Sequence, residues 1–111
     1  MKPRSDQYCE FGGLRIGEDY WASFSYTWPF ARISISTEST AIHVGVGPLF
    51  NQDLLFQKSD ITEIHRKRGL FNSSIEIKHS LDSLPLYIRY IPWSYTALKN
   101  AFEERGYIIN E

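Results

Sequence analysis

Alternating apolar and polar positions run along most of the chain, and this period of two predicts β-strands. Between residues 20 and 28 the even positions are apolar or aromatic, whereas positions 23, 25 and 27 are small and polar. This pattern predicts a half-buried strand in which most of the even-numbered aromatic side chains belong to the core. After Pro29 the apolar side chains move to the odd positions 31, 33 and 35. A phase change of one residue turns side chains to the opposite face, so we expect a bulge, a sharp bend or a chain reversal at residues 28–30.

Further strands follow at short intervals, each bounded by turn residues. They are expected at residues 41–46, 54–56, 62–67, 70–79 and 84–90. The strands at 62–67 and 70–79 are expected to form a hairpin with its tip at Arg68 and Gly69. Residues 1–19 are polar and interrupted by glycine, so we expect a flexible or loosely packed lead-in with one short strand at most. The domain itself is expected to cover residues 20–111.

The end of the chain changes to helical periodicity. Ser94 is a suitable N-cap, and an apolar stripe follows at residues 95, 98, 101 and 102. Gly106 suits the left-handed position after the last turn, where Tyr107 or Ile108 can pack back onto the helix. Because sheets need their open ends covered, six or seven antiparallel strands and one terminal helix predict a mainly β, α+β fold closed by that helix.

Several segments together resemble one family. They are residues 30–46, the turn at 59–64, the strands around 75–77 and 86–88, and the helix at 94–106. In strand order and helix position, residues 20–108 resemble a bacterial pleckstrin-homology-like (PH-like) domain, close in pattern to GRAM-type modules. The resemblance implies a small antiparallel barrel with a helix plugging one end, and a binding or assembly module instead of an enzyme.

Length, charge and cysteine content narrow the function classes. The 111 residues suffice for one domain, and 12 basic against 13 acidic side chains leave a net charge of -1. No broad basic field is present, so we expect no nucleic-acid partner. A single cysteine, Cys9, cannot form an internal disulfide, and no apolar segment follows the basic start. We therefore expect a cytoplasmic protein without a signal peptide or a transmembrane segment.

Catalytic and metal-binding patterns are missing from the sequence. The three histidines and the one cysteine have no metal-ligand spacing, and no Gly-x-Ser-x-Gly motif occurs. We expect no metal, no cofactor and no enzymatic activity. An enzyme acting on a small substrate ranks last among the functional hypotheses, because it would need polar groups that converge in a deep pocket.

Two groups of side chains are candidates for binding. The first group is the basic run at the hairpin tip: His65, Arg66, Lys67 and Arg68. These side chains could bind an anion. The alternative is a solvent-exposed hairpin whose charge is neutralised by nearby carboxylates. The second group comprises aromatic residues expected to be exposed: Trp21 on the polar face of the strand, Trp93 before the helix, and Trp28 or Phe30 beside the phase change at Pro29. Exposed aromatic side chains favour a protein partner or self-association. Protein contact is the leading hypothesis, and binding of anionic lipid or a phosphorylated ligand through residues 65–68 is the alternative.

Overall fold

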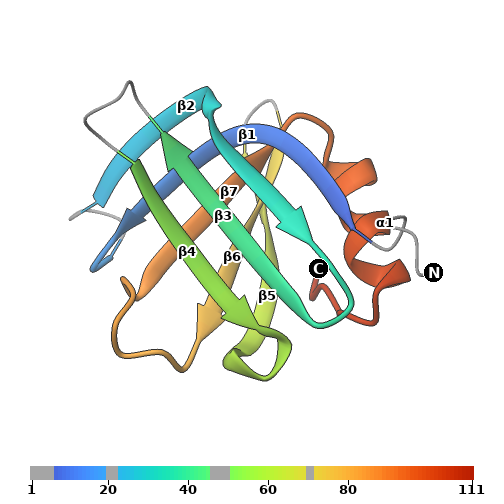
Figure 1. The fold of residues 1–111 in the computed structure, drawn as a ribbon. Helices are drawn as coiled ribbons and strands as arrows, with labels where there is room; N and C mark the ends of the chain where they lie inside the picture. Colours follow the sequence, from blue (N-terminus) through green and yellow to red (C-terminus); the bar gives the residue numbers. More distant parts are fainter. Residues whose placement is uncertain (1–6, 20–22, 46–50, 70–71) are drawn as a thin grey trace.

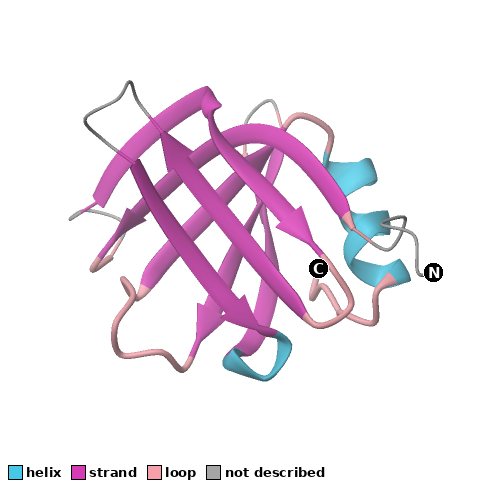
Figure 2. Cartoon of the chain, in the orientation of Figure 1, coloured by secondary structure: helices cyan, strands magenta, loops and turns pink. Residues whose placement is uncertain are grey.

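The computed structural model describes residues 7–19, 23–45, 51–69 and 72–111. These residues form seven strands, one α-helix and a short 3₁₀ helix: β1 (Tyr8–Gly17), β2 (Ser23–Ile35), β3 (Ser39–Gly45), β4 (Asn51–Gln57), the 3₁₀ helix η2 (Lys58–Asp60), β5 (Ile61–Arg68), β6 (Ser73–His79), β7 (Tyr87–Pro92) and α1 (Tyr95–Glu104). All pairs are antiparallel, and the strand order is β4-β3-β2-β1-β7-β6-β5. The sheet curls into a half-barrel with α1 at one end (Figures 1 and 2). The mainly β class with one C-terminal helix is therefore confirmed.

Residues 8–17 belong to the sheet, so the expectation of a loosely packed lead-in is wrong for them. They form β1, the central strand, which pairs with β2 on one side and with β7 on the other. Gly12, a residue typical of loops, is buried here, and a Cβ atom at this position would collide with the hydroxyl of Tyr90. The glycine thus permits close packing inside the sheet. Residues 1–6 lie outside the described part of the chain.

The phase change in β2 is a bulge, the first of the three predicted alternatives. Gly12 faces Ala31 and Leu14 faces Tyr26, so that Gly13 alone spans residues 27–30 of β2. The peptide bond between Trp28 and Pro29 is cis. Because the extra residues cannot all pair with one glycine, β2 kinks at this point. The bulge changes the parity of the positions and keeps the face, since Tyr26 opposite Leu14 and Ala31 opposite Gly12 lie on the same side of the sheet.

The even-numbered aromatic residues of β2 do not form the core as expected. Phe24 is 73% exposed and Trp28 is 53% exposed, and only Tyr26 packs partly against the core. The reason is topological, because β3 pairs with β2 only from Ala31 to Ile35 among the described residues. The first half of β2 therefore projects past β3. Residues 20–22 lie outside the described part of the chain.

The core lies on the concave side of the sheet and is mostly aliphatic. Its largest fully buried side chains are Leu14, Ile33, Ile35, Ile42, Leu54, Phe56, Ile64, Ile75, Ile77, Ile88, Tyr90 and Phe102. From α1, Leu98, Ala101 and Phe102 are buried, as the helical stripe predicted. The helix thereby covers apolar surface that the curled sheet alone would leave in water. No helix in the described ranges has the length and apolar character needed to cross a membrane.

Both ends of α1 have the predicted caps. The Ser94 hydroxyl oxygen accepts a hydrogen bond from the Ala97 amide at 3.3 Å. At the other end Gly106 has a φ of +88°, and its amide donates to the Glu103 carbonyl, while the Tyr107 amide donates to the Phe102 carbonyl. This is a Schellman end, completed by edge-to-face packing of the Tyr107 and Phe102 rings, whose centroids are 5.2 Å apart.

Candidate functional site

Two of the aromatic residues singled out in the sequence lie together on the surface. Trp28 is in the β2 bulge, and Trp93 follows β7, directly before the helix cap. Their ring centroids are 5.2 Å apart, with an angle of 38° between the planes. The rings nevertheless remain 53% and 75% exposed. We call them the tryptophan pair; two contacting indoles that keep most of their surface in water form an apolar contact point.

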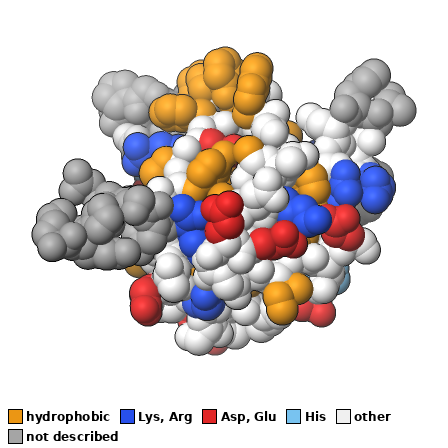
Figure 3. All heavy atoms as spheres, turned by 90° about the vertical axis from the view of Figure 1, so that its right-hand side faces the viewer, with side chains coloured by type: hydrophobic (Ala, Val, Ile, Leu, Met, Phe, Trp, Pro, Cys, Tyr) orange, Lys and Arg blue, Asp and Glu red, His pale blue; other side chains and the backbone are white. Residues whose placement is uncertain are grey.

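The sheet brings the tryptophan pair together because β2 and β7 flank the same strand. Gly13 of β1 faces both the bulge and Ile91 of β7. A Cβ atom on Gly13 would lie 2.9 Å from the carbonyl oxygen of Tyr26. This glycine therefore lets the bulged strand lie close over β1. In the space-filling view, hydrophobic side chains gather at the upper end of the molecule, the end at which the ribbon shows the kink of β2 (Figures 1 and 3).

A groove of about 590 Å³ runs beside the tryptophan pair. Its lining includes Gly13, Arg15, Ser25, Tyr26, Trp28, Asn72, Arg89, Ile91, Pro92 and Trp93. Apolar side chains from β7 and the indole rings thus share the groove with two arginines and small polar groups. A binding site commonly combines an apolar lining with a few polar groups that fix the orientation of the ligand.

The two arginines of the groove are its main chemical feature, and sequence reasoning did not single them out. Arg15 of β1 and Arg89 of β7 are direct partners in the antiparallel register, and both are half-buried. The Nε of Arg15 donates to the Ser23 hydroxyl at 2.7 Å, and that of Arg89 donates to the Ser74 hydroxyl at 2.6 Å. Their pairing depends on the contact between β1 and β7, for which the sequence carries no local signal.

Phe30 lies in a different place from the tryptophan pair. It is 43% exposed and lines a second hollow of about 370 Å³ together with Phe11, Arg32 and His43. The Nδ1 of His43 lies 2.5 Å from a carboxylate oxygen of Asp53 on the neighbouring strand β4. The bulge therefore divides the predicted aromatic set between two hollows. Trp21 is outside the described residues.

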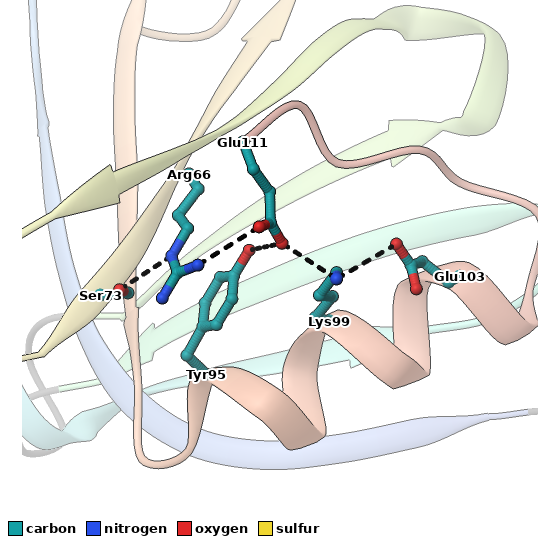
Figure 4. Close-up of polar contacts among 6 residues, drawn as sticks. All are labelled: Arg66, Ser73, Tyr95, Lys99, Glu103 and Glu111. Atoms are coloured by element: carbon teal, nitrogen blue, oxygen red, sulfur yellow. Dashed lines mark hydrogen bonds and ion pairs between the residues drawn. The ribbon is translucent and has the colours of Figure 1, made fainter.

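The basic hairpin is largely engaged in contacts of its own. Arg66 donates to the Ser73 hydroxyl at 3.0 Å, pairs with Glu111 at 3.3 Å and stacks on the Tyr95 ring, 4.3 Å from its centroid (Figure 4). The ammonium of Lys67 lies 3.3 Å from a carboxylate oxygen of Glu76. Arg68, at the end of β5, is exposed. Arg66 therefore packs against the helix, whereas Arg68 is exposed to solvent.

Glu111 joins the hairpin to the helix. Its carboxylate lies 3.0 Å from the Lys99 ammonium and accepts a hydrogen bond from the Tyr95 hydroxyl at 3.1 Å (Figure 4). The bond to Lys99 is the main reason that the pKa of Glu111 is lowered. Burial, followed by the bond to Glu111, raises the pKa of Tyr95 to about 12. The neighbouring Asn110 exchanges backbone hydrogen bonds with β5, so these contacts cover part of the β5 edge.

A carboxylate with two tyrosines lies at the start of β1. The Tyr8 hydroxyl donates to Glu10 Oε1 at 2.8 Å, and the Tyr90 hydroxyl donates to the Glu10 carbonyl at 3.3 Å. Burial is the main cause of the raised pKa of Glu10 and of both tyrosines. Within the described ranges no three His, Cys, Asp or Glu side chains are grouped so as to hold a metal ion.

Comparison with known proteins adds no assignment, because no family model matches the chain and no curated protein matches it. The functional argument therefore rests on the geometry of the groove and its tryptophan pair.

Proposed function

We propose that this protein is a non-enzymatic binding module that contacts another protein through the tryptophan pair and the adjoining groove. The observation that carries the proposal is that Trp28 and Trp93 contact each other while remaining 53% and 75% exposed. Tryptophan is among the residues that contribute most to protein interfaces, and such anchors are most effective next to a pocket. The groove of about 590 Å³ provides that pocket.

We also propose that the half-barrel is a PH-like domain. The strand order β4-β3-β2-β1-β7-β6-β5 and the position of the capped C-terminal helix support this assignment. The assignment favours binding over catalysis, as the resemblance implies. It does not itself identify the binding face, since function resides in the site and not in the fold.

A displayed library of random peptides tests the proposal. The library is selected on the immobilised wild-type protein and counter-selected on a variant carrying both Trp28→Ala and Trp93→Ala. We expect peptides that bind the wild type at least tenfold more tightly than the variant, because removing an interface anchor lowers the affinity by this factor or more. Sedimentation equilibrium over a range of concentrations tests the second form of the proposal, in which the partner is another copy of this chain.

Two outcomes support the proposal and one contradicts it. Selected peptides that need the tryptophan pair support a heterologous partner, and a dimer that dissociates in the double variant supports self-association. A wild-type protein that stays monomeric and enriches no peptide dependent on the pair would overturn the proposal.

Anionic lipid binding through residues 65–68 remains the alternative, with less support from the geometry. Arg66 and Lys67 already have carboxylate partners, and a membrane surface attracts clusters of several exposed basic residues. Sedimentation with vesicles containing phosphatidylserine tests it. Binding that is lost in Arg68→Gln and weakens with salt would favour lipid over protein contact.

A further inference from the structure

The two edges of the sheet are β4 and β5, and the β5 edge is protected (Figure 1). The register of β5 with β6 shifts near the start of the strand, and residues 66–68 are all basic. Asn110 also covers this edge, because its amide donates to the Ile64 carbonyl and its carbonyl accepts from the Arg66 amide, both at 2.8 Å. Bulges, charged side chains and a covering segment are the usual means that prevent an edge from pairing with another chain.

The β4 edge has neither the bulge nor the basic residues. Its register with β3 is unbroken from Asn51 to Gln57, and these residues include one charged side chain, that of Asp53, and neither lysine nor proline. The Asp53 side chain is 75% exposed and Leu55 is 56% exposed. An edge strand with these properties is a template to which an extended segment can add.

The hydrogen bonds around β4 show which of its backbone groups face away from β3. The Lys58 amide donates to the Glu38 carbonyl, just before β3, at 2.9 Å. Because backbone groups alternate in direction along a strand, the even-numbered residues of β4 face β3. The amides and carbonyls of Asp53 and Leu55 therefore face away, and they have no hydrogen-bond partner in the described ranges. The contact between His43 and Asp53 agrees, because side chains lie closer in pairs that exchange no backbone hydrogen bonds.

The open part of the edge ends where β4 meets η2. The Gln57 amide also faces away from β3, but it donates to Asp60 Oδ2 at 2.8 Å. The Ser80 amide donates to the Asp60 carbonyl at 3.0 Å, so this end of the strand is covered. Asp53 and Leu55 remain open, and an antiparallel strand could exchange two backbone hydrogen bonds with each of them.

The exposed side chains of the edge indicate which residues the added strand carries. The Asp53 carboxylate contacts His43 through Oδ1, which leaves acceptor sites for a Lys or Arg side chain directly opposite. Opposite Leu55 an apolar, β-branched side chain packs best. Side chains on one face are two residues apart, and the added strand runs from Leu55 toward Asp53. The segment therefore has Val or Ile two residues before Lys or Arg.

A second copy of β4 fits this edge less well than such a segment. Two-fold antiparallel pairing must place outward-facing residues opposite each other. Asp53 opposite its own copy brings like charges together, and Asp53 opposite Leu55 places a carboxylate against an apolar side chain. Leu55 opposite its own copy brings Asp53 to Gln57, whose amide is already bonded. Charge complementarity thus favours a different protein as the partner.

We propose that the β4 edge at Asp53 and Leu55 binds, by strand addition, an extended segment of another protein that carries Val or Ile two residues before Lys or Arg. Neither residue is part of the groove lining beside the tryptophan pair. The contact is therefore separate from the function proposed above and does not depend on it.

Hydrogen exchange with a capped peptide, acetyl-Thr-Val-Thr-Lys-Thr-amide, tests the proposal. In the free ¹⁵N-labelled protein we expect the outward-facing amides of Asp53 and Leu55 to exchange rapidly. When about 90% of the protein is bound, their exchange should slow about tenfold, because only the unbound tenth exchanges freely. The Leu54 amide faces β3 and should exchange slowly with or without peptide, which makes it an internal control.

Matched peptides separate backbone pairing from side-chain contact. A peptide with N-methylvaline lacks the donor for the Leu55 carbonyl and should bind about tenfold more weakly or worse. Replacing its Lys by Gln should weaken binding to the wild type about two- to fivefold, as for an opposite-charge cross-strand pair. This preference should vanish in Asp53→Asn. It should persist in Glu104→Gln, which removes one negative charge at the end of α1.

Leu55→Pro blocks the edge from the side of the protein. The Leu55 amide makes no bond to β3, and proline is tolerated where an edge amide faces solvent, so this variant should fold and lose peptide binding. Should it fail to fold, the N-methylated peptide tests the same hydrogen-bonded pair on the wild-type protein.

Three results would overturn the proposal. The first is unchanged exchange at Asp53 and Leu55, or equal binding of the N-methylated peptide. The second is a dimer in which both amides are protected without peptide and become exposed on dilution, since this would assign the edge to a second copy. The third is a peptide that loses binding in the variant carrying Trp28→Ala and Trp93→Ala, which would place the contact in the groove. Peptide binding that is unchanged in that double variant supports the β4 edge, whether or not the groove has a partner of its own.

Discussion

Replacing Trp93 by alanine shows whether this side chain serves mainly as a binding surface or mainly packs in the core. The side chain is 75% exposed, so about a quarter of a surface of about 250 Å² is buried, or about 60 Å². At about 25 cal/mol per Å², Trp93→Ala should lower the free energy of unfolding by about 1.5 kcal/mol. A buried tryptophan would cost about 3–5 kcal/mol. For an interface anchor, the same substitution should weaken binding by about 2 kcal/mol or more, roughly thirtyfold in Kd.

Urea unfolding followed by far-ultraviolet circular dichroism measures the stability change without relying on indole fluorescence. Binding is measured by fluorescence anisotropy of a labelled peptide from the selection. The matched control is Leu86→Ala, because Leu86 is 71% exposed and is not among the residues that line the groove. It should affect neither binding nor stability substantially. Combining Trp28→Ala with Trp93→Ala in a double-mutant cycle should give a coupling of about 0.5–1.5 kcal/mol from the ring contact.

Two results would refute this reasoning. A loss of unfolding free energy of about 3 kcal/mol or more in Trp93→Ala would mean that the ring is a core anchor. A coupling of zero between the two tryptophans would mean that the rings do not contact each other in solution.

Four further predictions follow from the fold. Phe102→Ala should cost about 3–5 kcal/mol of unfolding free energy in urea titrations, because this fully buried ring fixes α1 on the sheet; a loss below about 1 kcal/mol would contradict the packing of the helix. Gly106→Ala should cost about 1–2 kcal/mol, since φ at this position is +88°, and an unchanged urea midpoint would argue against the left-handed cap. Glu111→Gln should lower the thermal midpoint at pH 7 but not in strong acid. The pKa of Glu111 is lowered in the folded state, so its charged carboxylate stabilises the fold above the unfolded pKa. This stabilisation disappears as the pH falls through the folded pKa. Glu10→Gln should behave oppositely and raise the midpoint at pH 7, with a gain that vanishes in acid, because the pKa of Glu10 is raised by burial and its charged form is penalised; a gain that persists in acid would show a cause other than the charge.

Local chemistry made several elements predictable from the sequence. The N-cap at Ser94 and the left-handed Gly106 follow from the backbone preferences of those residues, and both are present. The phase change around Pro29 also followed from local pattern, since side chains alternate strictly along a strand. These signals depend on residues a few positions apart, so one segment contains all the information needed.

Other expectations failed because they depended on neighbours in space. Gly12 indicated a loop, yet it lies in the central strand because its missing side chain makes room for Tyr90. Phe24 alternated like a core residue, yet β2 extends past β3 there and leaves the ring in water. The period of two predicts which side chains share a face, but it does not show whether a second element covers that face.

The candidate site divides in the same way. The sequence by itself indicated that Trp93, and Trp28 or Phe30 beside Pro29, lie outside the core, and it placed basic residues at the tip of the β5–β6 hairpin. Only the tertiary structure decided that the two indoles meet, that Arg66 packs on the helix, and that Arg15 faces Arg89. The reason is that β1 lies between β2 and β7, and this long-range register brings together side chains from opposite ends of the chain.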